Sequence, residues 1–368
     1  MAAEPAPSAE VGTASGGLPV RPLLKPGVRR VWRDPETLQL GRDPARAVVV
    51  TDVDDPVWQL LSRLDGQSTL EGLLGSGLLP REVGRDLLAR LDAAGMLDDA
   101  AATSRPLASF TAARRAQLQP EYDALVRGQQ RPGQGAASFA RRKRAVVAVE
   151  GLGRVGSSIA LLLEACGVGQ VRVHDAELVT TAEVVPGGHR LVDVGRCRQD
   201  ALRDRLTPPP RRPGRRVDLV VLGDGVDLGT RRRRADELAG ADVPHLHVAV
   251  TEGCARVGPL VLPGRSSCHR CLDHHRADRD PAWPTLLAQL VDDAGETATA
   301  GLAAQSAALA VAAVTAWLDA APDGTADAGN EALVDAEVVI APPRLLPRRR
   351  SLTPHPACGC TWRGTIAS

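Results

Sequence analysis

Four cysteines form two closely spaced pairs, Cys268–His–Arg–Cys271 and Cys358–Gly–Cys360. Each pair can bring two thiolates toward one point, and two such pairs supply the four sulfur ligands of a tetrahedral zinc site. The pairs lie 87 residues apart, so one zinc ion would hold the C-terminal tail against the body of its domain. Four thiolates leave no position for water, and we therefore expect a structural rather than a catalytic zinc ion.

The alternative for these cysteines is a set of disulfides or unreactive thiols. A disulfide within CxC is strained, and Cys166, Cys197 and Cys254 resemble ordinary small core residues. Residues 1–20 carry neither the basic segment nor the apolar run of a signal peptide, and we predict a disordered tail there. We thus expect a cytoplasmic protein, in a compartment where thiols stay reduced and available to zinc.

The composition disfavours two classes of partner. The formal net charge is +1 at pH 7, which gives no bulk attraction to nucleic acid or to membrane surfaces. Aromatic residues make up only 2% of the chain, so few rings exist to stack on bases, and the arginine run 231–234 is interpreted as helix surface. The longest apolar run, 302–318, is interrupted by polar residues and is more typical of a buried helix than of a membrane span.

The 368 residues have room for two domains. Residues 21–100 mix short strand-like runs with three helical leucine patterns, which predicts a small α+β, winged-helix-like domain. Residues 101–142 lack clear apolar periodicity, and we predict a linker with some helix. Its end carries a basic cluster, Arg141 to Arg144, which is either solvated surface or a neighbour of bound phosphate. Residues 143–368 follow an α/β pattern.

A glycine-rich loop opens this α/β region. A short apolar strand over 145–149 is followed directly by Gly151–Leu–Gly153–Arg–Val–Gly156, which leads into an apolar helix over 157–165. A second strand then closes on Asp175, 24 residues after the first glycine. This order of strand, loop, helix, strand and acid predicts a doubly wound, Rossmann-like nucleotide-binding domain.

Each part of the loop has an expected role. Gly151 permits a tight turn, Gly153 lets a phosphate approach the backbone, and Gly156 lets the helix pack on the sheet. The helix N-terminus presents free amides to phosphate, Asp175 is placed to bind ribose hydroxyls, and Arg154 is a further nucleotide-binding candidate. The loop alone does not separate NAD from ATP, and a glycine turn in a domain that binds no nucleotide is the other interpretation.

The loop and the cysteine pairs together resemble the ThiF/MoeB/HesA family of adenylating enzymes, which are related to ubiquitin-activating enzymes. The matching segments are Val149–Gly156, Ala165–Asp175, Val243–His245 continuing through Gly258–Leu272, and Pro356–Cys360, where CxC replaces the family's usual CxxC. The resemblance covers residues 143–362 and implies a ThiF-type, Rossmann-like domain with a zinc site, in a chain that forms a homodimer.

The resemblance also implies the formation of an acyl-adenylate from ATP and the C-terminal carboxylate of a peptide or small protein, with pyrophosphate as the leaving group. The implied cofactors are ATP, Mg²⁺ and Zn²⁺. The glycine loop and Asp175 would then bind ATP, Arg198 would contact phosphate in place of the family's lysine, and Asp224 would hold magnesium.

The chain departs from the family at several of these positions. The family's Asn and Arg after the second strand have no clear counterpart, although Arg190 is a candidate after a shift. Arginine also reaches phosphate with a different geometry from lysine. Asp227 is an alternative to Asp224 for magnesium, and no cysteine is convincingly placed as a thioester nucleophile, Cys254 being nearest to the substrate side.

The N-terminal region carries a second resemblance. Residues 24–27 and 60–70 look like the PqqD-type module, which binds leader peptides of ribosomal peptide precursors by adding the peptide as a strand. ThiF-like proteins fused to such modules occur in azole- and azoline-forming peptide clusters. The alternative is a generic winged-helix docking or dimerisation domain, whereas the balanced charge of the third helical pattern, 81–92, disfavours DNA binding.

Three functions remain open at this point. The first is an ATP-dependent adenylyltransferase acting on a peptide or protein carboxylate. The second is a catalytically degenerate ThiF-like scaffold that binds a leader peptide and presents a ribosomal peptide precursor to a partner modifying enzyme. The third, an NAD(P)-dependent oxidoreductase, explains the glycine loop but not the cysteine pairs. ATP turnover separates the first two.

Overall fold

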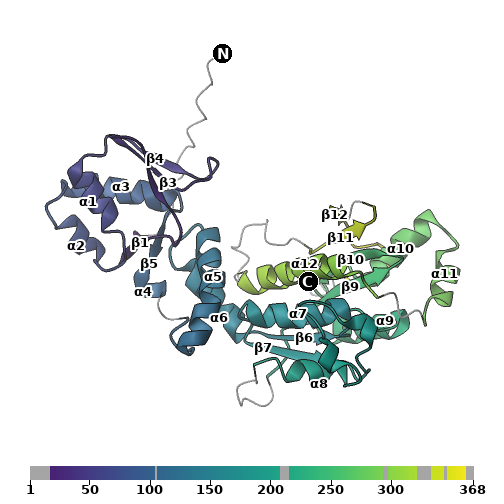
Figure 1. Ribbon diagram of the computed structural model, residues 1–368. Coiled ribbons are helices and arrows are strands. Elements are labelled where there is room, and N and C mark those ends of the chain that lie inside the picture. Colours follow the sequence, from purple (N-terminus) through teal and green to yellow (C-terminus); the bar gives the residue numbers. More distant parts are fainter. Residues whose placement is uncertain are drawn as a thin grey trace. The chain divides into compact units, whose positions relative to one another are not determined.

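The computed structural model of this protein describes residues 17–103, 106–207, 215–292, 297–320, 333–343 and 346–361. The chain divides into two compact units, Met1–Ala140 and Arg141–Ser368 (Figure 1). Most of the tail predicted to be disordered, residues 1–20, lies outside the described residues.

Two small antiparallel sheets form part of the N-terminal unit. Their strands are β1 (Pro22–Leu24), β2 (Arg30–Asp34), β3 (Thr37–Leu40), β4 (Val48–Val50) and β5 (Leu97–Asp99). β1 pairs with β5, while β2, β3 and β4 form a three-stranded sheet. The turns follow the Asp–Pro pairs of the sequence, because the carboxylates of Asp34 and Asp43 accept the N–H groups of Glu36 and Ala45.

Helices complete this unit. They are α1 (Asp55–Ser62), α2 (Leu70–Leu74), α3 (Arg81–Ala93), α4 (Ala100–Thr103), α5 (Ala112–Gly128) and α6 (Gln134–Arg144), the last of which crosses into the second unit. Asp54 caps α1 by accepting the N–H of Val57, and Thr69 caps α2 in the same way. Leucines of α1 to α3 pack on β3 in one buried core, as their spacing predicts. The winged-helix-like class of this unit stays a prediction.

The segment predicted as a linker, 101–142, is more helical than expected. Leu118, Tyr122 and Val126 of α5 are buried, and Phe139 of α6 packs against them, with its ring centroid 5.4 Å from that of Tyr122. The buried stripe of α5 has one residue per turn, which is too narrow to stand out as apolar periodicity. The segment is therefore a packed pair of helices and not an extended connection.

Among the described residues, the C-terminal unit has one seven-stranded sheet in the order β12-β11-β10-β9-β8-β6-β7. Its strands are β6 (Val146–Glu150), β7 (Gln170–His174), β8 (Leu219–Leu222), β9 (His245–Thr251), β10 (Cys254–Val261), β11 (Ala336–Ala341) and β12 (Leu346–Ser351). The pairs formed among β7, β6, β8 and β9 are parallel, whereas β10, β11 and β12 add antiparallel pairs. The predicted Rossmann-like pattern thus holds for the parallel half, and the sheet as a whole is mixed.

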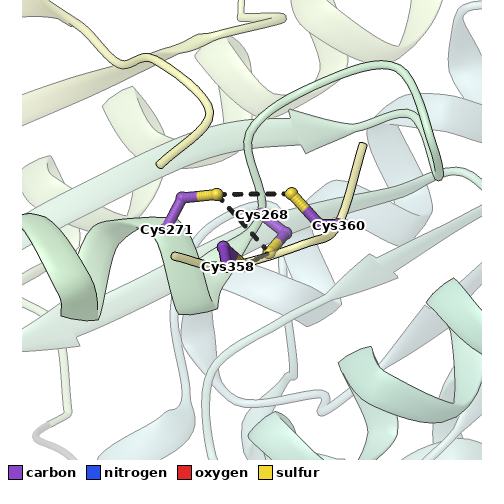
Figure 2. Close-up of side chains that lie close together, drawn as sticks. All are labelled: Cys268, Cys271, Cys358 and Cys360. Atoms are coloured by element: carbon purple, nitrogen blue, oxygen red, sulfur yellow. Dashed lines mark hydrogen bonds between the residues drawn. The ribbon is translucent and has the colours of Figure 1, made fainter. Parts of the chain in front are cut away.

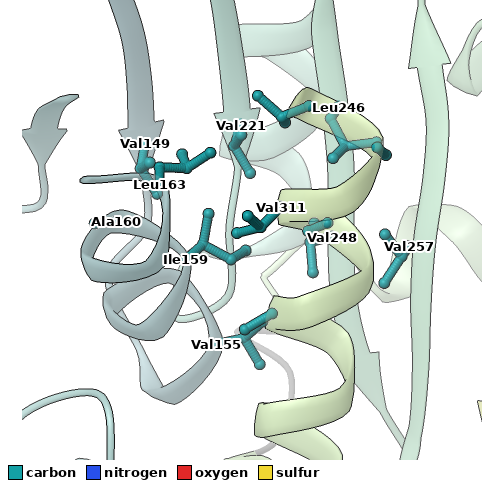
Figure 3. Close-up of a cluster of buried hydrophobic side chains, with 14 of the residues drawn as sticks. Val149, Val155, Ile159, Ala160, Leu163, Val221, Leu246, Val248, Val257 and Val311 are labelled. Atoms are coloured by element: carbon teal, nitrogen blue, oxygen red, sulfur yellow. The ribbon is translucent and has the colours of Figure 1, made fainter. Parts of the chain in front are cut away.

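Helices cover both faces of this sheet. They are α7 (Arg154–Ala165), α8 (Arg198–Arg203), α9 (Leu228–Gly240), α10 (His269–Arg279), α11 (Trp283–Gln289) and α12 (Ala300–Asp319), with short 3-10 helices η1 (Thr181–Glu183) and η2 (Leu191–Asp193). α7 and α12 share one core with the sheet face that carries Val149, Val221 and Val248 (Figure 3). The opposite face packs Ala148 and Val220 against α9. This alternation along β6 and β8 is the signature of strands covered on both sides.

The basic cluster at the end of α6 has a structural role that neither predicted interpretation covers. Arg142 is buried and forms an ion pair with Asp319, with its Nε 3.0 Å from the Asp319 Oδ1 atom. Arg142 also donates to the carbonyl of Cys166, and Arg141 donates to the carbonyl of Asp319. These cations therefore bind the C-terminal ends of α7 and α12, where helix carbonyls favour positive charge.

One helix, α12, is long and apolar enough by length and composition to cross a membrane. In this fold it carries buried residues such as Leu302, Ala307 and Val314, which pack in the core shared with α7 and the sheet. Its apolar character is therefore accounted for by core packing.

Candidate functional site

A cavity of 680 Å³ opens at the carboxyl ends of the parallel strands. Glu150, His174 and Leu222, the last residues of β6, β7 and β8, all line it. The chain runs from β6 to β7 on one side and returns to β8 on the other side of β6. The cavity therefore lies at the topological switch point, where open α/β sheets bind their ligands. It is called the nucleotide cavity below, after the ligand that the sequence analysis predicts for it.

The glycine loop forms part of this cavity's wall. Gly151 lines the cavity and has a φ of +85°, which confirms the predicted tight turn. Its N–H donates to the carbonyl of His174 at 3.2 Å and so joins the loop to β7. A Cβ at Gly156 would lie 2.0 Å from the carbonyl oxygen of Gly151. Gly156 thus lets the helix approach its own loop, and it also lies near the end of β8, because a Cβ on Gly223 would be 3.3 Å from the Gly156 Cα atom.

The carboxylate of Asp224 lies at the N-terminus of α7, where the sequence analysis predicted a phosphate group. Asp224 follows β8, is 5% exposed, and accepts the N–H groups of Val155 at 3.0 Å and Gly156 at 2.8 Å. A Cβ at Gly153 would lie 2.6 Å from its Oδ2 atom, so this glycine makes room for a carboxylate. Burial raises the pKa of Asp224, and the two amides oppose that shift. The first-turn amides of α7 are engaged, contrary to the prediction that they are free.

The predicted magnesium role of Asp224 is therefore not supported by its position. Asp224 is not among the residues that line the nucleotide cavity, whereas Asp227 is. Asp227 caps α9 by accepting the N–H of Thr230 at 2.8 Å, and this bond lowers its pKa. The structure places the alternative acid, and not the predicted one, at the cavity wall.

Asp175 and Arg198, the predicted ribose and phosphate contacts, both line the nucleotide cavity and pair with each other. Arg198 Nη1 lies 3.0 Å from Asp175 Oδ2, and its Nη2 forms an ion pair with Glu183. Asp175 also accepts the N–H of Leu152 at 2.7 Å. Burial would lower the pKa of Arg198, but the two carboxylates outweigh it and raise that pKa, so the guanidinium stays charged. Glu183 had no predicted role.

Other predicted residues lie elsewhere. Arg154 does not line the nucleotide cavity, and its Nη1 donates to the carbonyl of Ala298 at 2.8 Å, so its assignment to the nucleotide is not supported. Arg190 bonds Asp193, three residues along the chain, instead of facing this cavity. Arg231, by contrast, belongs to the run interpreted as surface and yet lines the cavity with a buried Nε atom. The sequence placed Arg231 at the start of a helix that follows a strand end, and this position could have indicated that it lines the cavity.

The four cysteines come together as predicted (Figure 2). The sulfur of Cys268 lies 3.9 Å from that of Cys271 and 3.5 Å from that of Cys358, and the Cys271 and Cys360 sulfurs are 3.3 Å apart. Sulfurs bound to one zinc ion at tetrahedral positions are about 3.8 Å apart. Hydrogen bonding and burial raise the pKa of Cys268, burial raises that of Cys360, and the hydrogen bond with Cys268 lowers the pKa of Cys271 to about 4. A dication offsets this cost by binding thiolates, so the group fits zinc.

The C-terminal tail is fixed next to this cluster by further contacts. His355 donates its N–H to the sulfur of Cys271, and its Nε2 lies 2.9 Å from the carboxylate of Asp278 on α10. His275 of α10 bonds the carbonyl of Thr353 at 2.9 Å. His275, Asp278 and His355 lie close enough to share an ion, but each already has a protein partner. We interpret them as supports that hold the tail in position for the cysteines.

Comparison with known proteins gives a likeness in fold. No protein-family model and no curated protein matches this chain. A solved structure of E. coli MccB with AMPCPP and MccA is 13% identical, has a TM-score of 0.64, and matches over 92% of this chain and 99% of that chain. The microcin C7 biosynthetic enzyme MccB with N-formylated MccA is 14% identical, with a TM-score of 0.62 and the same coverage.

A third solved structure, that of PaaA, is 17% identical with a TM-score of 0.60, over 89% of this chain and 99% of that chain. The chain has an MccB-like fold. The coverage is too large to be met by the C-terminal unit alone, so the N-terminal unit takes part in the likeness. At these identities the likeness concerns the fold, and residue roles depend on the geometry described above.

Proposed function

We propose that this protein is an ATP-dependent adenylyltransferase that activates the carboxyl end of a peptide or small protein. The observation that carries the proposal is a cavity at the switch point, beside a glycine loop, whose wall combines carboxylates with guanidinium groups. The MccB-like fold supports it, because the solved MccB structures include one with ATP and others with MccA. ATP supplies the adenylyl group, and the carboxylate takes it up with release of pyrophosphate.

The residues of the cavity suggest a division of roles. Arg198, held by Asp175 and Glu183, would present a fixed guanidinium to phosphate oxygens. Arg233 is exposed and lines the same cavity, so it adds positive charge at its mouth. Asp227 takes over from Asp224 as the residue proposed to hold magnesium, because it lines the cavity. Such a site works by positioning and charge stabilisation, without a covalent enzyme intermediate.

We propose a peptide-recognition role for the N-terminal unit. Val31 and Trp32 on β2 are 45% and 44% exposed, and Val49 on β4 is 42% exposed. β2 and β4 are the two edges of the three-stranded sheet, so either can accept an added strand. Exposed apolar side chains on an edge strand suit the leader-peptide binding that the PqqD resemblance implies. A homodimer and a partner modifying enzyme remain proposals that follow from the resemblance.

ATP binding tests the function most directly. Calorimetry of the zinc-loaded full chain with ATP and Mg²⁺ should show binding, with NAD as a second ligand that does not bind. Asp175→Ala should weaken ATP binding about 100-fold, which is about 2.7 kcal/mol, because it removes the partner that positions Arg198.

Asp200→Ala, an exposed acid on α8 outside the cavity, is the matched control and should leave ATP affinity unchanged. No ATP binding in the wild type would contradict the adenylyltransferase and favour the peptide-presenting scaffold. Binding of NAD in place of ATP would favour the oxidoreductase.

A further inference from the structure

Three cavities of the C-terminal unit follow one another and share walls. The nucleotide cavity and a middle cavity of 110 Å³ have Arg231 in common. The middle cavity and an outer cavity of 350 Å³ share Arg256, Leu272, Arg276 and Glu337. The nucleotide and outer cavities share no lining residue. The middle cavity therefore lies between the other two.

Arg231 is the unusual residue of this row. Its Nε atom is buried without a hydrogen-bond partner, and its Nη2 reaches only the carbonyl of Val226 at 3.4 Å. Within the described ranges, no carboxylate lies within ion-pair distance of Arg231, whereas Arg232 and Arg256 each have one. A buried guanidinium keeps its proton and costs free energy unless an anion compensates it. The wall between two cavities thus carries a cation without a direct ion pair, because the carboxylates of Asp224 and Asp227 act on it only from beyond ion-pair distance.

The middle cavity also carries a histidine with an unused ring nitrogen. The Nε2 atom of His247 is buried and has no partner among the described residues, and the same is true of Nδ1 in His269, whose ring centroid is 5.8 Å away. Burial lowers the pKa of His247 well below its usual value, so its ring is neutral. A neutral imidazole can donate one hydrogen bond to a carboxylate oxygen. Buried polar atoms without partners usually mark a missing ligand or water.

The rest of the wall of the middle cavity is part charged and part apolar. Arg232 with Asp273 and Arg256 with Glu337 form ion pairs in it, and Arg276 is a further cation. Leu228, Ala249, Pro259 and Leu272 make up the apolar part. Its 110 Å³ correspond to about four water molecules at liquid density. This is room for a carboxylate and a small side chain, and the apolar part of the wall suits the carbon atoms of that side chain. The cavity therefore matches the last residue of a peptide.

We propose that the row of cavities is the route of the acyl substrate, with its terminal carboxylate in the middle cavity against Arg231 and His247. The preceding residues would lie in the outer cavity, and ATP would lie in the nucleotide cavity on the other side of Arg231. This proposal rests on the function proposed above and adds the residues that select the substrate.

The outer cavity adds a preference for certain residues just before the carboxyl end of the peptide. Among its lining residues, Arg256, Arg276, Arg279 and Arg350 outnumber the acids Asp280 and Glu337. Trp283 lines the same cavity under Arg276, whose guanidinium carbon is 4.8 Å from the ring centroid. The excess of positive charge favours acidic residues just before the carboxyl end.

The chemistry of this arrangement balances without a proton donor. A carboxylate oxygen forms a bond to the α-phosphorus of ATP, and the bond from that phosphorus to the bridging oxygen breaks. Pyrophosphate leaves with the electron pair. Arg231 touches both cavities and would neutralise charge on the incoming carboxylate and on the α-phosphate. It is thus assigned as a catalytic residue, and His247 as a substrate-orienting one.

Matched synthetic peptides test the route. The probes are acetyl-Glu-Glu-Ala with a free carboxylate, the same peptide as its amide, and acetyl-Lys-Lys-Ala with a free carboxylate. Calorimetry with the zinc-loaded full chain should give at least about a tenfold preference for the first probe over the amide, because only it satisfies Arg231 (1.4 kcal/mol per factor of ten). Arg231→Met should abolish this preference, and His247→Gln should reduce it.

Charge reversal tests the outer cavity. Arg350→Glu should weaken binding of the acidic probe about fivefold or more and strengthen that of the lysine probe. Arg349→Glu makes the same charge change on the preceding residue of β12, which does not line the cavity, and should change neither affinity.

Several outcomes would overturn the route. These are equal affinity for the acid and the amide, an Arg231→Met variant that keeps the preference, and no measurable binding of any probe. Zinc content and thermal unfolding confirm that each variant is folded, and His247→Gln keeps the test open if Arg231→Met does not fold. ATP binding measured on the same samples separates the two proposals, since ATP binding without discrimination between acid and amide would contradict the route alone.

Discussion

The cysteine cluster and the nucleotide cavity are both assembled from distant segments of the chain. They differ in whether their side chains have partners of opposite charge within the protein. In the cavity, Arg198 already pairs with Asp175 and Glu183, and behind its glycine loop Asp224 already accepts the amides of α7. The four cysteines contact mainly one another, and burial raises the pKa of Cys268 and of Cys360, whereas the hydrogen bond with Cys268 lowers the pKa of Cys271. The charges of Asp175, Glu183 and Arg198 are therefore compensated within the protein, whereas the four thiols are arranged so that a cation could compensate them.

This difference sets what a ligand does at each place. A nucleotide would bind next to ion pairs that already exist. Its affinity would therefore depend on how much stronger its own contacts with Arg198 are than the contacts they replace or share. A zinc ion would displace the protons that remain on these thiols and form four bonds to sulfur, and its binding free energy would be folding free energy. Loss of the metal should therefore affect stability far more than loss of a cavity residue.

The largest effect is expected from the cysteine cluster. Cys268→Ser should remove zinc and lower the free energy of unfolding by about 4 kcal/mol or more, because a buried metal site loses a ligand. Zinc content by mass spectrometry and thermal unfolding provide the measurement. Cys254→Ser, which changes a cysteine outside the cluster, is the control. If Cys268→Ser keeps its zinc content and its stability, the cysteine cluster is not a structural metal site and does not differ from the cavity in the way described.

An intermediate effect is expected at the cap of α7. Asp224→Ala should lower the free energy of unfolding by about 2–3 kcal/mol, because the buried amides of Val155 and Gly156 lose their acceptor. Asp227→Ala removes a more exposed cap from α9 and should cost about 1 kcal/mol. Urea unfolding of both variants measures the difference. Equal costs would mean that Asp224 is not the internal anion described here.

The smallest effect is a dependence on pH. Because burial raises the folded-state pKa of Asp224, its stabilising contribution is complete below the unfolded value of about 3.9 and is lost as pH rises through the folded pKa. Wild type should therefore lose stability relative to Asp224→Asn between about pH 4 and neutrality. Unfolding of both proteins across this range gives the comparison, and a difference that stays constant or reverses would show that the folded pKa is not raised.

The sequence predicted features whose residues lie close together in the chain. The tight turn at Gly151, the strand ending before Asp175 and the helices over the leucine patterns all appear where the spacing places them. The cysteines were also predictable, although their two pairs are far apart, because four sulfur ligands in two short motifs have few other uses. In each case local geometry or ligand chemistry was enough.

The roles of the charged residues could not be obtained in this way. Asp224 and Asp227 are three positions apart, yet one lies under the glycine loop and the other lines the cavity. Which acid lies where depends on how the segment after β8 turns, and spacing does not determine that turn. Similarly, Arg142 and Arg231 belong to basic runs that resemble surface, and only the packed fold shows that each is buried at a helix end or a cavity wall.

The position of the C-terminal tail links metal supply to substrate choice. β12 and the residue after it contribute Arg350 and Leu352 to the outer cavity, and the chain then runs straight to Cys358 and Cys360. A metal ion at the cysteines would anchor that wall from its far end. If both proposals hold, zinc and the acidic peptide are thermodynamically coupled, so each raises the apparent affinity of the other. Zinc starvation would then weaken the protein's selectivity for its substrate as well as its stability.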